Sequence, residues 1–235
     1  MLIWMPMPRL GRGFFAFHAG VALAMEITAH ALTGSAEHLC IHGPYAASLF
    51  LLLILFSIRR LQWTPMLLRI AATAGAFALA TDAYRGVPVS AAAAIPAVLT
   101  SALVAGSMIV TMNLGHWYLV IHGLPLEFLG AANRVCVWIL GARIGAIAMG
   151  AALAFDAWKK LFSPGGGPLW DTALFLTVRV SFGLVAPLIL AWMIHECVKI
   201  KSTQSATGIL YVSVVFVLIG ELSGMYFLME RGLPL

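Results

Sequence analysis

The chain has 235 residues, of which 62% are hydrophobic and 10% are charged, with a mean hydropathy of +0.98 and a formal net charge of +5. Soluble domains carry charge on about a quarter of their residues, so this composition excludes an ordinary soluble domain and indicates a protein whose solvent is lipid. The positive charge does not indicate a nucleic-acid partner, because the lysines and arginines are scattered or flank apolar segments and form no basic helix face.

Seven apolar runs approach the length of about 20 residues that a helix needs to cross a bilayer. The predicted helices are Phe14–Gly34, Pro44–Ile58, Pro65–Ala83, Pro88–Met112, Phe128–Phe155, Leu169–Ile194 and Thr207–Met229. Charged residues, glycines and prolines separate these runs, as is typical of loops. We therefore expect an all-α, polytopic integral membrane helix bundle, forming a single transmembrane domain over residues 1–235.

The lysines and arginines near the helix ends predict the orientation, because positive residues collect on the cytoplasmic side of a membrane protein. One side carries Arg9, Arg12, Arg59, Arg60, Arg69, Lys199 and Lys201, and the other carries Arg85, Lys159, Lys160 and Arg231. This asymmetry predicts a cytoplasmic N-terminus and an external C-terminus. A bacterial inner membrane is the expected location.

The first predicted helix carries an acid and two imidazoles. Glu26 and His30 are four residues apart and share a face, and His18 lies about 80° round the helix from Glu26. A carboxylate beside an imidazole can relay protons, accept a proton from a quinol or orient a metal ligand. The alternative for each histidine is an ordinary hydrogen bond between helices.

The loop expected after this helix contains a second histidine group. If it is extended, His38, Cys40 and His42 lie on one side, because side chains alternate along an extended chain. Imidazole and thiolate ligands would suit copper or zinc. Three such residues also occur together by chance, so a polar loop at the membrane surface is favoured over a metal ion.

Asn113, His116 and Trp117 form the most distinctive group, at the end of the fourth predicted helix. Spacings of three and four residues let the amide, imidazole and indole converge. An interface anchor explains Trp117 well but explains Asn113 and His116 less well. We therefore predict that this group contacts a quinone head group or a haem near the cytoplasmic surface.

Haem b needs axial ligands from facing helices. His18, His116 and His195 come from three different predicted helices and lie at comparable depth. They are the candidate ligands of a single haem b. The chain has no CxxCH motif, so no c-type haem attachment is expected.

Small residues in two helices predict close packing between helices. Gly141 and Gly145 are four residues apart in the fifth helix, and Gly220 and Gly224 repeat this spacing in the seventh. Such pairs let two helix backbones approach each other in lipid. Packing within the chain is the favoured interpretation, and a dimer interface is the alternative.

Four ionisable side chains fall near the middle of apolar helices: Glu26, Arg143, Arg179 and Glu221. A charge at this depth costs about 2.5 to 3.5 kcal/mol on insertion scales, so it is expected to have a partner or a function. The two acids and two bases can form an internal proton or charge network, or they can merely fix helix register. If Arg179 pairs with Glu221 alone, Arg179→Ala should harm folding more than Arg179→Ala combined with Glu221→Gln.

The C-terminal third contains Arg179-Val-Ser-Phe-Gly-Leu-Val-Ala-Pro187, then Gly208-Ile-Leu-Tyr211 and Val217-Leu-Ile-Gly220-Glu221-Leu222-Ser223-Gly224. This stretch resembles the last two helices of the quinone-reactive membrane anchors of the polysulfide reductase and dimethyl sulfoxide reductase class. The resemblance implies quinone chemistry in association with a catalytic partner subunit.

The leading functional hypothesis is an integral membrane subunit of a redox complex that binds a quinone and haem b. It is expected to work with other subunits rather than as a stand-alone enzyme. One alternative is a transporter of protons or small anions, with Arg143 and Arg179 as the anion site and Glu26 as the proton carrier. Another is a metal-dependent membrane enzyme or assembly factor that uses the histidines.

Overall fold

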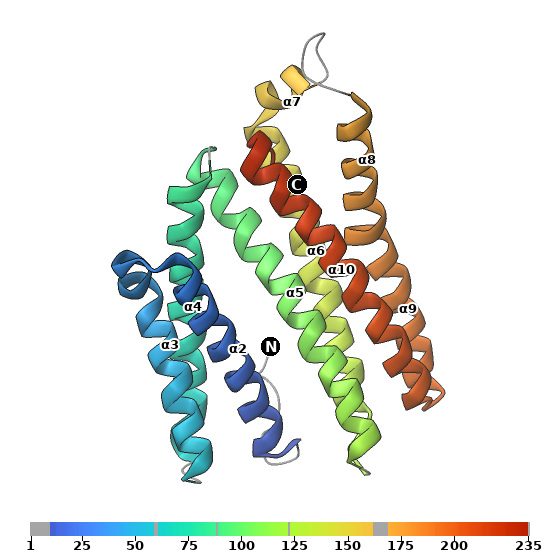
Figure 1. Cartoon of the computed structure of the whole chain (residues 1–235). Helices are drawn as coiled ribbons and strands as arrows, with labels where there is room; N and C mark the ends of the chain where they lie inside the picture. Colours follow the sequence, from blue (N-terminus) through green and yellow to red (C-terminus); the bar gives the residue numbers. More distant parts are fainter. Residues whose placement is uncertain (1–9, 59–60, 88, 122, 162–168, 235) are drawn as a thin grey trace. The chain divides into compact units, whose positions relative to one another are not determined.

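The computed structural model describes residues 10–58, 61–87, 89–121, 123–161 and 169–234, and every regular element in these ranges is helical. Seven helices in this part of the chain are long and apolar enough to cross a bilayer (Figure 1). They are α2 (Arg12–Thr33), α3 (Ala36–Ser57), α4 (Thr64–Gly86), α5 (Ala91–Val120), α6 (Glu127–Leu153), a composite span over Thr172–Lys199, and α10 (Thr203–Arg231). The predicted all-α membrane bundle is therefore confirmed, and the protein is an integral membrane protein.

The helices pack as two compact units, residues 1–81 and 82–235, and each is considered by itself. The first contains α2, α3, the short 3₁₀ turn η2 (Leu61–Trp63) and most of α4. The second contains α5, α6, the short helix α7 (Phe155–Leu161), the composite span and α10.

In the first unit, α2 and α3 are joined by a tight turn. Gly34 ends α2 with a left-handed backbone (φ 61°), which glycine adopts without strain. Ser35 caps α3, and its side chain accepts a hydrogen bond of 2.9 Å from the His38 backbone N–H. The helix expected to start at Pro44 therefore starts eight residues earlier, at Ala36, and Pro44 lies inside it.

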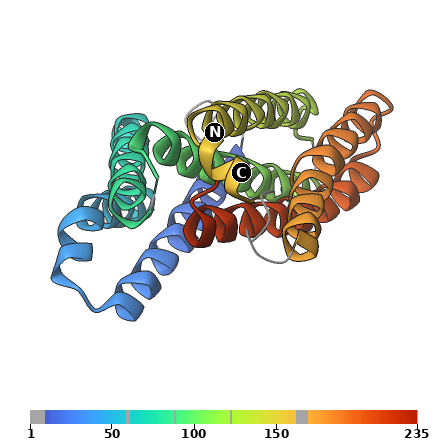
Figure 2. The same cartoon turned by 90° about the horizontal axis from the view of Figure 1, so that it is seen from above.

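In the second unit, α5, α6, α10 and the composite span pack side by side, with α10 against both α5 and the composite span (Figure 2). Close approach depends on small residues. A Cβ atom added to Gly115 of α5 would lie 3.0 Å from Leu210 and 3.1 Å from Thr207, both of α10. Asn133 of α6 adds a buried hydrogen bond of 2.8 Å to the Ala191 carbonyl of the composite span.

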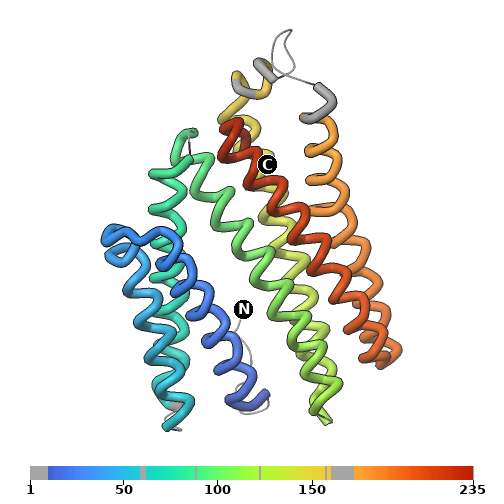
Figure 3. The backbone as a smooth tube through the Cα atoms, in the orientation of Figure 1, coloured from blue at the N-terminus to red at the C-terminus, as the bar shows by residue number. Residues whose placement is uncertain are grey.

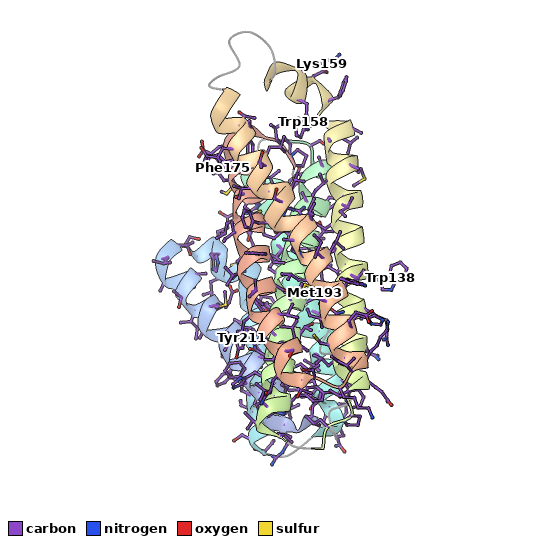
Figure 4. All side chains as sticks on the ribbon, turned by 90° about the vertical axis from the view of Figure 1, so that its right-hand side faces the viewer. Trp138, Trp158, Lys159, Phe175, Met193 and Tyr211 are labelled. Atoms are coloured by element: carbon purple, nitrogen blue, oxygen red, sulfur yellow. The ribbon has the colours of Figure 1, made fainter. Side chains whose placement is uncertain are left out.

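The glycine pair in α6 does not pack as expected. Among the described residues of the second unit, no neighbouring helix or side chain lies within 4 Å of a Cβ built on Gly141 or Gly145, so this pair does not mediate the expected packing there. Trp138, one turn earlier, is 79% exposed and points away from the neighbouring helices (Figure 4). The prediction holds for Gly220, which packs directly on Gly183.

The composite span is one continuous helix in the backbone trace (Figure 3). It consists of α8 (Leu169–Val180), a π-helical turn η3 (Ser181–Val185) and α9 (Ala186–Lys199). π-Helical turns inside α-helices are rare overall, and those that occur are often found at functional sites. Arg179 lies two residues before this turn, and Gly183 lies within it.

The orientation can be measured with reporter fusions in the second unit. The α5–α6 and α9–α10 connections line one pocket, so they lie on the same side of the bundle. An alkaline phosphatase fusion after Lys201 should be inactive and one after Arg231 should be active, because the first connection is predicted to be cytoplasmic. The reverse pattern of activity would contradict the predicted orientation.

Candidate functional site

The second unit contains one carboxylate shared by two arginines from different helices. Oε1 of Glu221 lies 2.9 Å from Nη1 of Arg179, and Oε2 lies 3.0 Å from Nη2 of Arg143. The side chains of the two arginines are 1% exposed and that of Glu221 is 5% exposed. The sequence leaves open which acid meets which base; in the structure Arg179 pairs with one carboxylate oxygen of Glu221 and Arg143 pairs with the other. We call these three residues the Arg–Glu–Arg cluster.

The cluster lies well inside the apolar part of the bundle. Arg143 precedes the end of α6 by ten residues, and Glu221 precedes the end of α10 by the same number. Ten helical residues span about 15 Å, which is about half of a hydrocarbon core about 30 Å thick. Long side chains can reach the headgroup region from the last turns of a helix, but not from this depth. The charges must therefore be compensated within the protein.

Arg143 is held from a second direction by α5. Its Nη1 atom donates to the Ala97 carbonyl at 2.8 Å and to Thr100 Oγ1 at 3.3 Å. The Thr100 hydroxyl itself donates to the Pro96 carbonyl at 2.6 Å, which leaves its oxygen lone pairs free to accept from Arg143. The guanidinium of Arg143 thus connects α5, α6 and α10, so its position is determined by three helices.

Arg179 is less completely satisfied. Only its Nη1 atom reaches Glu221, while Nε and Nη2 are buried and find no hydrogen-bond partner among the described residues. Nε and Nη2 form the edge of a guanidinium that binds two oxygen atoms at once. Two guanidiniums and one carboxylate also leave the cluster with a net charge of +1. The cluster therefore offers both a positive charge and two N–H groups to a ligand oxygen.

Two glycines create the space for this arrangement. A Cβ atom on Gly183 would lie 2.2 Å from Nη1 of Arg179, and a Cβ atom on Gly220 would lie 2.1 Å from Gly183 Cα. Gly220 immediately precedes Glu221 in α10. The contact between the two glycine backbones therefore sets the distance between the π-helical turn and α10, and with it the Arg179–Glu221 ion pair.

Glu26 has its partners in the first unit. Its Oε1 atom lies 3.0 Å from Nδ1 of His42 and 3.8 Å from Nε2 of His38. The sequence predicts that Glu26 lies beside His30 and takes part in a charge network. It does not predict that His38 and His42 lie close to Glu26. The spacing of four between these two histidines would have indicated a shared helical face, had the segment been expected to be helical.

Cys40 does not belong to this group. The predicted alternation of His38, Cys40 and His42 requires an extended segment, and residues 36–57 are helical instead. In a helix, a residue two positions away from both histidines points to a different side. Cys40 is exposed accordingly.

His116 has an interhelical partner that the sequence does not indicate. Its Nδ1 atom lies 3.0 Å from the Tyr211 hydroxyl of α10, and the imidazole is exposed. Figure 4 labels Tyr211 on α10. Asn113 and Trp117 are half-buried on the same helix, so the three residues are neighbours on α5, and the imidazole is hydrogen-bonded to a tyrosine of another helix. His122 lies outside the described residues.

The other two candidate haem ligands have different surroundings. Nδ1 of His18 lies 2.7 Å from the Phe14 carbonyl of its own helix, and the ring packs against Phe14 at 4.5 Å between centroids. His195 lines a pocket of about 560 Å³ in the second unit, together with Arg134, Lys199, Lys201 and Glu127. Axial ligation of haem b by these histidines stays a prediction.

Arg134 lies in the lining of this pocket. The pocket is located where the α5–α6 connection meets the end of α9, and its lining contains three cations and one carboxylate in addition to His195. Basic residues at the end of membrane helices are typical of contacts with lipid head groups. Arg134 is exposed there, as expected for a side chain that reaches the membrane surface.

Two constellations therefore stand out by geometry: the Arg–Glu–Arg cluster in the second unit, and Glu26 with His38 and His42 in the first. The resemblance of the last two helices to quinone-reactive anchors stays a prediction. No protein-family model, curated protein or solved structure matches this chain.

Proposed function

We propose that this protein is a membrane subunit of a redox complex and binds a quinone at the Arg–Glu–Arg cluster. The observation that supports this proposal is the buried, net positive cluster in which Nε and Nη2 of Arg179 have no hydrogen-bond partner among the described residues. A buried N–H group without a partner costs about 1 to 3 kcal/mol, so a ligand that supplies an acceptor oxygen gains affinity there.

A quinone suits this environment for two chemical reasons. Its ring and tail are soluble in lipid, and its carbonyl oxygens accept hydrogen bonds. Reduction places negative charge on those oxygens, and a guanidinium that stays protonated stabilises that charge. Glu221 holds Arg179 in position through Nη1, so the opposite edge is oriented before the ligand arrives.

The proposal of a partner subunit rests on the resemblance of the helices that contain Arg179 and Glu221 to quinone-reactive membrane anchors. A quinone-binding subunit needs an electron donor or acceptor, which a catalytic subunit of the same complex would supply. Haem b, held by His116, His195 or His18, would be a further part of such an electron path, in a bacterial inner membrane. A reduced-minus-oxidised visible spectrum of the purified protein would reveal the haem directly.

The composite span favours a second candidate, a transporter of small anions. Transporter sites often lie where a membrane helix is interrupted near the middle of the bilayer. Here the π-helical turn begins two residues after Arg179, and Pro187 lies two residues beyond the end of that turn. The same Nε–Nη2 edge would bind a carboxylate in this case. The two candidates therefore differ in the ligand rather than in the residues.

Arg179→Lys should separate ligand binding from folding, because lysine keeps the charge but lacks the two-pronged edge. We expect a short-chain ubiquinone analogue to bind the purified wild-type protein, and Arg179→Lys to weaken binding about tenfold to a hundredfold, which corresponds to the loss of charge-assisted hydrogen bonds. Titration calorimetry in detergent measures the dissociation constants of the wild type and of Arg179→Lys.

The matched control is Arg134→Lys, the same substitution at an exposed arginine of the second unit. It should leave quinone affinity unchanged. Binding of acetate by the wild type, together with no binding of the quinone analogue, would favour the anion transporter. Equal quinone affinity of the wild type and Arg179→Lys would contradict the assignment of the site.

A further inference from the structure

We propose that Glu26, His38 and His42 bind a divalent transition-metal ion of the zinc class. The site belongs to the first unit and does not depend on quinone binding in the second. Its three donors come from two helices, with the carboxylate on α2 and both imidazoles on the first two turns of α3.

The backbone presents the two imidazoles together. His38 and His42 are four residues apart in α3, so their side chains project from the same face. Their rings are almost parallel, with an interplanar angle of 6° and 4.2 Å between centroids. The Ser35 cap fixes the first turn through the His38 backbone N–H. The short turn at Gly34 and Ser35 then brings α2, and with it Glu26, alongside.

The distances between the donor atoms match a metal site. Oε1 of Glu26 lies 3.0 Å from Nδ1 of His42 and 3.8 Å from Nε2 of His38, and one potential ligand atom from each of the three residues lies within 4.8 Å of the other two. Two ligands of tetrahedral zinc lie about 3.3 to 3.6 Å apart, given bond lengths of about 2.0 to 2.2 Å. Small side-chain rotations would therefore place all three atoms at bonding distance from one ion.

Three buried polar atoms near this point have no hydrogen-bond partner among the described residues. Oε1 of Glu26 and Nδ1 of His38 are buried and make no hydrogen bond to the described residues, and the same holds for Nδ1 of His30. The side chains of Glu26, His38 and His42 are 13%, 15% and 12% exposed. Leaving a buried carboxylate oxygen unsatisfied is costly, and a bound cation would remove that cost for Glu26.

The donor set selects the class of ion. Imidazole nitrogen suits zinc, copper, iron and nickel, and a carboxylate is compatible with each of them, whereas magnesium and calcium prefer oxygen ligands alone. Three protein donors leave a coordination position for water or a substrate. His30, whose ring lies 5.6 Å from that of His38, is the nearest further imidazole. The site is open rather than fully enclosed by protein ligands.

Zinc titration of the full-length chain tests the proposal. The protein is purified in detergent through a tag without histidines, stripped with a chelator and titrated with Zn²⁺ by calorimetry. We expect one equivalent to bind to the wild type and to raise its unfolding temperature, because a ligand that binds only the folded state stabilises it. Glu26→Gln and His42→Gln should each lower the affinity at least about tenfold, since each removes one of three ligands.

Cys40→Ser is the matched control, because Cys40 lies two residues from both histidines but is exposed. It should bind zinc as the wild type does. Unfolding temperatures of the metal-free variants show whether each is folded before titration. Absence of zinc binding by folded wild-type protein, or wild-type affinity in both Glu26→Gln and His42→Gln, would overturn the proposal.

Discussion

Glu221→Gln is expected to destabilise the protein more than any other single change to the buried charges. Glu221 neutralises Arg143 and Arg179 at once, so its loss raises the net charge of the cluster from +1 to +2. Removing one partner of a buried ion pair costs about 3 to 5 kcal/mol, and here one substitution strands two cations. We expect little monodisperse protein from Glu221→Gln and a strongly lowered unfolding temperature in detergent.

The shared carboxylate also determines the order of the other variants. Arg179→Ala leaves Glu221 paired with Arg143 and the site neutral, whereas Arg179→Ala combined with Glu221→Gln strands Arg143 in the bundle. The double variant should therefore be the less stable of the two. This order is the opposite of the one expected from the sequence, which assumed a single pair.

Glu196→Gln provides the control for these measurements. Glu196 pairs with Lys199 at 2.8 Å, but the two side chains are 44% and 57% exposed. Ion pairs at the surface contribute about 0 to 1 kcal/mol, so this substitution should leave the unfolding temperature nearly unchanged. A similar small effect of Glu221→Gln would show that the cluster is not needed for folding.

Gly220→Ala is the second change with a large expected effect. The new methyl group would lie 2.1 Å from Gly183 Cα and 2.5 Å from its backbone nitrogen, and neither atom can move without moving the π-helical turn. Forcing extra atoms into a packed contact costs about 1 to 3 kcal/mol, and occasionally more. We expect a loss at the upper end of this range, measured by thermal unfolding, together with weaker quinone binding because Glu221 shifts away from Arg179.

Gly208→Ala is the control in the same helix. A Cβ atom there has nothing of the described chain within 4 Å, so it meets no obstacle. Alanine is favoured over glycine in a helix by about 0.5 to 1 kcal/mol, so this variant should be unchanged or slightly more stable. Equal stability of the two variants would show that the Gly183–Gly220 contact does not hold the helices in place.

The number and type of the helices followed from the sequence, because hydropathy and length are properties of each segment alone. The four ionisable residues near the middle of the apolar runs could also be identified from the sequence, since their positions along these runs do not depend on the fold. The start of α3 was not found in this way, because the apolar run begins at Pro44, whereas the helix begins eight residues earlier, at Ala36 after the Ser35 cap.

The sequence by itself determined an all-helical membrane protein with buried charge. Only the tertiary structure decided which charges and histidines meet. Glu221 serves two arginines, Glu26 faces His38 and His42, and His116 meets Tyr211. The physical reason is that periodicity within one helix sets the face on which a side chain lies, whereas its partner depends on the packing and register of another helix, which no local pattern encodes.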